Sequence, residues 1–180
     1  LAKLEGTYGV DAAPTAAANG IMTKDVTIAP MEGNDVNRDL ATPYLGGQGS
    51  LPIDLHSKLS FSVELAGSGT AGVAPAYGPL LRGAACAETI VADTSVTYNP
   101  VSDDHESLSL YFHVGRTQYV LKGARGNCTV ELNASGVPYL KFEFTGLFQQ
   151  PSEQARALPT LSAFQKPLAV SDRNTPVFTM

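Results

Sequence analysis

Residues 53–65 read IDLHSKLSFSVEL, and this stretch decides the fold. Its apolar side chains recur at alternate positions, namely Ile53, Leu55, Leu59, Phe61, Val63 and Leu65. The polar side chains between them are His56, Lys58, Ser60, Ser62 and Glu64. Successive side chains of a β-strand point to opposite faces, so this period of two predicts a long strand with one face over a core and the other toward water.

The composition predicts one globular domain. Of the 180 residues, 43% are hydrophobic and 16% are charged, and a chain of this length buries roughly 70% of its unfolded surface. The 17 Asp and Glu outnumber the 12 Lys and Arg, which gives a net charge of -5. Sequence-independent binding to nucleic acid depends on a basic surface, so this charge argues against such a function.

The sequence shows no targeting or membrane signal. It contains no stretch of about 18 apolar residues, and its Ala-rich N-terminal segment lacks the basic start and apolar run of a signal peptide. We therefore expect a soluble, unexported protein. The chain begins at Leu1 without an initiator Met and stops within the strand-like phrase NTPVFTM, which leaves open that it is part of something longer.

Cys86 and Cys128 are the only cysteines. Both lie in apolar surroundings, which favours free, buried thiols that behave as small hydrophobic groups. The alternative is a disulfide between them, worth about 4 kcal/mol in the chain-entropy model. A thiol count under denaturing conditions distinguishes the two.

Further alternating segments predict more strands. They cover residues 21–30, 89–98, 107–114, 117–123, 127–134 and 139–148. Turn residues separate them, among them the glycines of 123–126 and Ser135-Gly136. Short strands spaced in this way are typical of antiparallel sheets that form a sandwich or barrel. We therefore predict a mainly β fold of two packed antiparallel sheets.

One short helix accompanies these strands in the prediction. Pro75 suits the first turn of a helix, and apolar residues follow it at helical spacing, which predicts a helix over about 75–87. The preceding segment GSGTAG at 67–72 is predicted to be an irregular linker. The breaker-rich TPYLGGQGSLP at 42–52 predicts a mobile loop before the long strand.

The chain divides into a domain with an arm at each end. Residues 1–20 are rich in Ala, Gly and Thr and predict an N-terminal arm, and residues 21–150 hold the β-domain. Residues 151–180 carry Pro151, Pro159, Pro167 and Pro176, which predicts an extended C-terminal arm. The two arms and the loop at 42–52 contribute few residues to the domain's own core. We therefore expect contacts with other copies of the protein to order them.

The sequence indicates no catalytic, metal or cofactor site, so we expect a protein that is not an enzyme. The cluster at 103–106, DDHE, lacks calcium-loop spacing and predicts a solvated turn. Neither a zinc pattern, nor a phosphate-binding Gly-Lys-Ser/Thr ending, nor a Gly-x-Ser-x-Gly elbow occurs. Lys122 and Arg125 flank the glycine turn and suit an anion, but salt bridges to a neighbouring subunit fit an acidic chain better.

Three phrases resemble the tail tube (major tail) proteins of long, non-contractile-tailed bacteriophages. They are EGTYGVDAAPT at 5–15, VELAGSGTAGVAPAYGPLLRGA at 63–84 and VLKGARGNCTVELNASGVPYLKFEFTGLF at 120–148. The resemblance implies two packed β-sheets with a flanking helix, in a virion protein that forms hexameric rings stacked into a tube. It implies assembly in the bacterial host cytoplasm, no cofactor, and other tail proteins at the tube ends as further partners. DNA would pass through the lumen unbound, which suits an acidic chain.

The resemblance also implies roles for particular residues. The inter-ring loop would be Thr42, Pro43, Tyr44, Leu45, Gly46, Gly47, Gln48, Gly49 and Ser50. We expect the lumen to be lined by Lys58, Ser60, Ser62, Glu64, Lys141, Glu143 and Thr145, with Glu131 and Asn133 as weaker candidates. The alternative is that some of these residues face outward on the tube.

The alternatives to the tube are a binding module and a hydrolase. A β-sandwich that recognises a receptor or carbohydrate at a tail tip would present aromatic residues on its loops, but most Tyr and Phe here fall within predicted strands or the helix, with Tyr44 as the exception. A hydrolase would need convergent titratable groups that the sequence does not display.

Overall fold

The computed structural model describes residues 1–38, 40, 41, 43, 46–171, 173 and 174. Over these residues the protein is mainly β, with a seven-stranded antiparallel sheet, a two-stranded sheet and one short helix, α1 (Gly78–Gly83). The large sheet comprises β1 (Ala2–Leu4), β2 (Lys24–Asn37), β3 (Ser50–Glu64), β6 (Leu108–Val114), β7 (Thr117–Glu131), β8 (Tyr139–Leu147) and β9 (Ser152–Glu153). The small sheet comprises β4 (Cys86–Val91) and β5 (Ser95–Pro100). The predicted fold class is confirmed.

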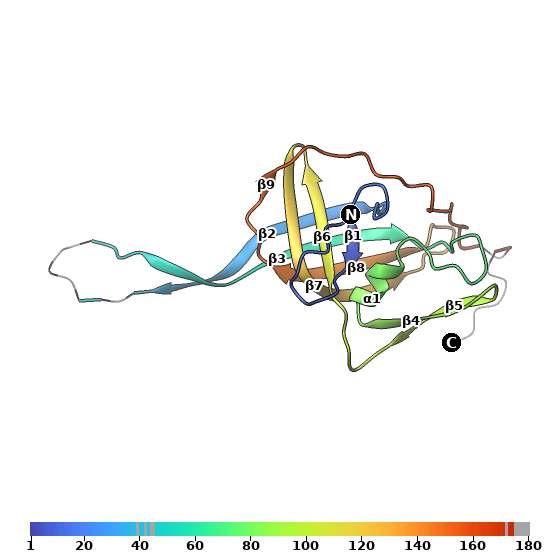
Figure 1. Ribbon diagram of the computed structural model, residues 1–180, viewed down its shortest axis with the longest axis horizontal. Coiled ribbons are helices and arrows are strands. Elements are labelled where there is room, and N and C mark those ends of the chain that lie inside the picture. Colours follow the sequence, from blue (N-terminus) through green and yellow to red (C-terminus); the bar gives the residue numbers. More distant parts are fainter. Residues whose placement is uncertain (39, 42, 44–45, 172, 175–180) are drawn as a thin grey trace.

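The large sheet forms two layers because β7 belongs to both. Its order is β1-β6-β7-β8-β3-β2, with β9 beside β7. The first half of β7 pairs with β6 up to Ala124, and the second half pairs with β8 from Lys122 onward. Figure 1 shows β6 and the start of β7 crossing over β2, β3 and β8. One continuous sheet therefore encloses the core between its own two parts.

Three phenylalanines form the centre of the core. Phe61 on β3 and Phe142 and Phe144 on β8 lie with ring centroids 5.8 to 6.0 Å apart. Leu108 and Leu121, from the opposing layer, are fully buried, as is Leu80 of α1. The core face of β3 and β8 is therefore the apolar set that the alternation predicted.

The long predicted strand is confirmed, but its core contact is shorter than the alternation suggested. Burial on the apolar face of β3 begins at Ser57 and continues through Leu59, Phe61 and Val63. Ile53, which the alternation placed over the core, is 41% exposed. Figure 1 shows the reason: β2 and β3 continue as a hairpin that projects well beyond the second layer.

The predicted glycine turn at 123–126 is wrong, because β7 runs through it as one strand. Gly123 has a positive φ of 60°, and the pairing with β8 shifts in register between Lys122 and Arg125. Gly126 lies so close to β8 that a Cβ there would clash with the carbonyl oxygen of Glu143. The glycines therefore allow a bulge and a close approach instead of a reversal of the chain.

We predict that Gly126→Ala destabilises the fold by about 1–3 kcal/mol, the usual cost of forcing extra atoms into a packed site. The added methyl group would push β7 away from β8 at the fold-over. Gly46→Ala is the matched control, because a Cβ there meets nothing within 4 Å. Urea unfolding of the two variants measures the difference, and equal midpoints would contradict the close approach.

Three other predicted elements differ from the structure. The segment 89–98 is the β4–β5 hairpin instead of one strand, and its turn contains Asp93 with a positive φ of 55°. The helix predicted over 75–87 is limited to the six residues of α1. Ala85 has a φ of 61°, which ends the helical course before β4 begins at Cys86. The first predicted strand, 21–30, is extended to Asn37 by pairing with β3.

Both predicted arms lie against their own domain, which corrects the expectation that other copies order them. Ala2 of β1 pairs with Leu110 of β6 and is 2% exposed. In the C-terminal segment, β9 pairs with β7, Thr160 N donates to Ala16 O, and Phe164 packs on the core. These contacts join residues far apart in the chain, so local sequence patterns carry no signal for them.

Candidate functional site: a polar sheet face and a projecting arm

The seven predicted lumen residues lie on one face of the sheet. Three directly opposed pairs of β3 and β8 define it, namely Lys58 with Thr145, Ser60 with Glu143 and Ser62 with Lys141. Directly opposed residues share a face, and Glu64 continues this face opposite Tyr139. The intervening residues of both strands form the core. We call this surface the polar face.

The polar face extends over four strands. Asn127, Thr129 and Glu131 of β7 lie opposite Glu143, Lys141 and Tyr139 of β8. On the other side, Thr27 of β2 lies opposite Ser60. Glu131 is therefore on the polar face, as predicted for the weaker candidates, whereas Asn133 lies beyond the end of β7. The result is a continuous polar surface across β7, β8, β3 and β2.

The lysines of the polar face are paired with carboxylates. Lys58 Nζ lies 2.5 Å from Glu32 Oε2, Lys141 Nζ lies 3.3 Å from Glu143 Oε1, and Lys24 Nζ lies 3.5 Å from Asp25 Oδ2. The hydrogen bond from Lys58 is the main cause that lowers the pKa of Glu32, with the charges of Lys58 and His56 adding to it. The positive charges of this face are therefore largely balanced by local carboxylates.

The described residues in the projecting part of the β2–β3 hairpin form what we call the arm, namely 33–38, 40, 41, 43 and 46–53. Its apolar stripe consists of Val36, Leu51 and Ile53, which are 46%, 54% and 41% exposed. Val36 and Leu51 are directly opposed, and Ile53 follows on the same side of β3. The sequence alone does not reveal this stripe, because the spacing of Leu51 and Ile53 continues the alternation of the core residues that follow. The unusual length of β3 was the available signal, since strands average about 5–6 residues.

The described residues of the predicted inter-ring loop lie at the end of the arm. Pro43, Gly46, Gly47, Gln48 and Gly49 lie between the strands, and Ser50 already belongs to β3. Thr42, Tyr44 and Leu45 lie outside the described residues. The loop ends earlier than the predicted 42–52 because Ser50, Leu51 and Pro52 pair with β2.

Lys122 and Arg125, predicted to contact another subunit, lie at the bulge of β7. The guanidinium of Arg125 stacks 4.8 Å from the ring centroid of Tyr8 and its Nη2 donates to His105 O at 2.6 Å. Lys122 lies opposite Leu147 and is half-buried. Arg125 thus has partners within its own chain that the sequence did not reveal.

The remaining candidates take the following positions. Within 103–106, Glu106 forms a two-point ion pair with Arg82, at 2.5 and 2.6 Å. Cys86 and Cys128 are free, half-buried thiols, and burial raises the pKa of Cys128 to about 11. Among the described residues, no group of three or more His, Cys, Asp or Glu could hold a metal ion. No helix in that part of the chain is long and apolar enough to span a membrane.

Fold and surfaces together define a two-layered antiparallel β protein with a polar sheet face and a projecting arm. Neither a scan against protein-family models nor a search of curated proteins finds a match to this chain.

Proposed function

We propose that this chain is a structural subunit of a phage tail tube, which acts by self-association into stacked rings around a channel for DNA. The observation that carries the proposal is the apolar stripe of the arm. Val36, Leu51 and Ile53 are exposed together on the part of the hairpin that projects past the chain's own second layer. Exposed apolar side chains on a projecting hairpin are typical of an interaction surface.

The sheet edges offer a route for lateral association. The second half of β7 pairs with β8 on one side, and over 126–131 no further backbone hydrogen bond occurs among the described residues. The opposite edge of this layer is β2, which among the described residues pairs only with β3. When two different edges meet in successive copies, the contact is heterologous and closes into a ring if the rotation allows it.

The polar face suits the lining of a DNA channel. Phosphates bind proteins mainly through Lys and Arg, but here Lys58 and Lys141 each contact a carboxylate of the same chain. Hydroxyl and amide groups, such as those of Ser60, Thr145 and Asn127, occupy much of the remaining face. Such a surface would hold little attraction for passing DNA.

The proposal predicts rings or tubes in negative-stain electron micrographs of the purified protein. The double variant Leu51→Asp and Ile53→Asp should abolish tubes, because it places two charges in the apolar stripe. The circular dichroism spectrum should stay unchanged, since neither side chain is part of the core. Leu168→Asp is the matched control, as Leu168 is 72% exposed outside the arm, and it should assemble normally.

A wild-type protein that stays monomeric at high concentration would argue against the tube. Saturable carbohydrate binding by such a monomer would instead favour the receptor-binding alternative. Assembly of the double variant into normal tubes would show that the arm is not the contact between rings.

A further inference from the structure

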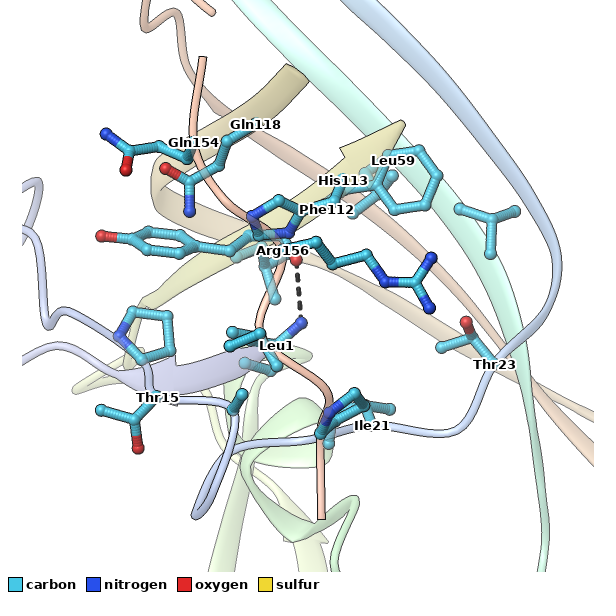
Figure 2. Close-up of a pocket in the computed structure, with 18 of the residues that line it drawn as sticks. Leu1, Thr15, Ile21, Thr23, Leu59, Phe112, His113, Gln118, Gln154 and Arg156 are labelled. Atoms are coloured by element: carbon cyan, nitrogen blue, oxygen red, sulfur yellow. Dashed lines mark hydrogen bonds between the residues drawn. The ribbon is translucent and has the colours of Figure 1, made fainter. Parts of the chain in front are cut away.

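A cavity of about 550 Å³ opens on the body of the domain, between the two layers and the C-terminal segment. Its inner wall is apolar and reaches the core, because Leu59 and Phe61 of β3, each 5% exposed, both line it. Figure 2 shows Leu59 in this wall together with Phe112 from β6 and Ile21 from the segment before β2. The volume is within the range of pockets that hold small ligands.

The C-terminal segment borders the cavity without filling it. Its lining residues include Ala155, Arg156 and Ala157, and the two alanines offer only methyl groups to the space above the core. The next residue, Leu158, does not line the cavity and is 80% exposed. The segment therefore has its charged residue at the cavity and its large apolar residue in solvent. Packing of a core by itself would select the reverse arrangement.

Arg156 is a cation at the cavity without a carboxylate partner. The lining includes neither Asp nor Glu. Glu153, three residues earlier, is paired with Arg116 at 2.9 Å, and Asp11 accepts a hydrogen bond from the hydroxyl of Tyr111 at 2.6 Å. Arg156 makes no ion pair or side-chain hydrogen bond with any residue that the structure describes. It is therefore available to a carboxylate, which a guanidinium binds through two parallel hydrogen bonds.

Two further polar groups lie at the same opening. In Figure 2 the guanidinium of Arg156 points toward Thr23, whose hydroxyl can donate another hydrogen bond to a ligand. His113 also lines the cavity. Burial is the main cause that lowers the pKa of His113, and the charges of the N-terminal amino group and Arg156 lower it further. The opening of the cavity is therefore electropositive, whereas its inner wall is apolar.

We propose that this cavity binds an apolar molecule that carries one carboxylate group, such as a medium-chain fatty acid. The carboxylate pairs with Arg156, and the apolar chain lies against Leu59, Phe61 and Phe112. Apolar walls with a few polar groups that fix the orientation of the ligand are typical of small-molecule sites. The inference goes beyond the proposed tube function and does not rest on it, because one folded copy supplies every residue of the cavity.

Isothermal titration calorimetry with decanoate, below its micelle concentration, tests this site. Wild type should bind one decanoate per chain. Decyltrimethylammonium, which has an apolar chain of the same length but a cationic head, should bind at least about tenfold more weakly, as expected when a hydrogen bond between charged groups is lost. Arg156→Glu should reverse this preference. Leu158→Glu is the matched control, because it places a carboxylate on the same segment outside the cavity, and it should keep the wild-type preference.

A second pair of variants tests the location of the ligand. Ala157→Trp places a large ring at the cavity, which Ala157 lines, and should abolish binding of decanoate. Ala163→Trp, on the same segment outside the lining, should bind decanoate as wild type does. The inference fails if wild type does not bind decanoate, if Arg156→Glu still prefers decanoate, or if Ala157→Trp binds it normally. Each of these failures leaves the tube proposal standing, since micrographs of the wild-type protein test it separately.

Discussion

Replacing Phe142 by Ala is expected to lower the free energy of unfolding by about 3–5 kcal/mol, the usual range for a buried Phe. Phe142 is fully buried between Phe61 and Phe144, where β8 meets the opposing layer. The variant loses apolar burial and leaves a cavity among rigid strands that cannot close around it. Because domains are stable by only about 5–15 kcal/mol, this single change removes a large share of the total.

Urea unfolding followed by circular dichroism measures this effect. Val114→Ala is the control, since Val114 is 53% exposed and surface changes usually stay within about 0.5 kcal/mol. Phe142→Leu removes fewer atoms and should lose less stability, which keeps the comparison possible if the Ala variant does not fold. Equal stability of Phe142→Ala and the control would contradict the position of Phe142 at the centre of the core.

Glu5 is the second position where we expect a large loss. Its carboxylate accepts four hydrogen bonds, from Gly9 N and Ser107 Oγ on Oε2 and from Ser109 Oγ and Gly123 N on Oε1, at 2.7 to 2.8 Å. It thereby holds the N-terminal segment against β6 and the bulge of β7. An amide in Glu5→Gln offers one acceptor oxygen to these donors, so we expect a loss of about 2–4 kcal/mol from donors left without a partner.

The effect of Glu5 should depend on pH. Burial by itself would raise the pKa of Glu5, but the hydrogen bonds outweigh it and lower the pKa below the usual 4.5. A carboxyl group with a lowered pKa in the folded state contributes its stability above the unfolded pKa and loses it as the pH falls through the folded pKa. The stability difference between wild type and Glu5→Gln should therefore be full at pH 6 and shrink below pH 4.5.

Thermal unfolding of both proteins over this pH range provides the measurement. Glu143→Gln is the control, because Glu143 lies exposed on the polar face beside Lys141, and it should change stability little at any pH. A difference between wild type and Glu5→Gln that stays constant from pH 6 to pH 3 would mean that the carboxylate does not act through its charge.

Much of the polar face could be predicted from the sequence. Alternation along β3 and β8 assigns Lys58, Ser60 and Ser62 to one face of the first strand, and Lys141, Glu143 and Thr145 to one face of the second. Only the register shows that these residues lie opposite each other. The lysine partner Glu32 was missed, because it lies on β2 beyond an irregular stretch of pairing that no local pattern indicates.

The errors at the glycines and the chain ends have a common cause. Glycine permits both a turn and a bulge. The sequence GARG at 123–126 can therefore be assigned to a bulge only when its pairing with β8 is known. The short β1 gains its role from pairing with β6, which lies more than a hundred residues away. Local sequence patterns describe what a segment can do, and long-range contacts select among these options.

By itself, the sequence determined that this is a β protein and which side chains share a face within each regular stretch of strand, because side chains alternate across an extended chain. The tertiary structure alone decided where the alternation of residues 53–65 meets a core and where it does not. The second layer covers β3 only from Ser57 onward. The same apolar pattern is therefore core at Leu59 and Phe61 and, on the arm, the exposed surface from which we infer assembly.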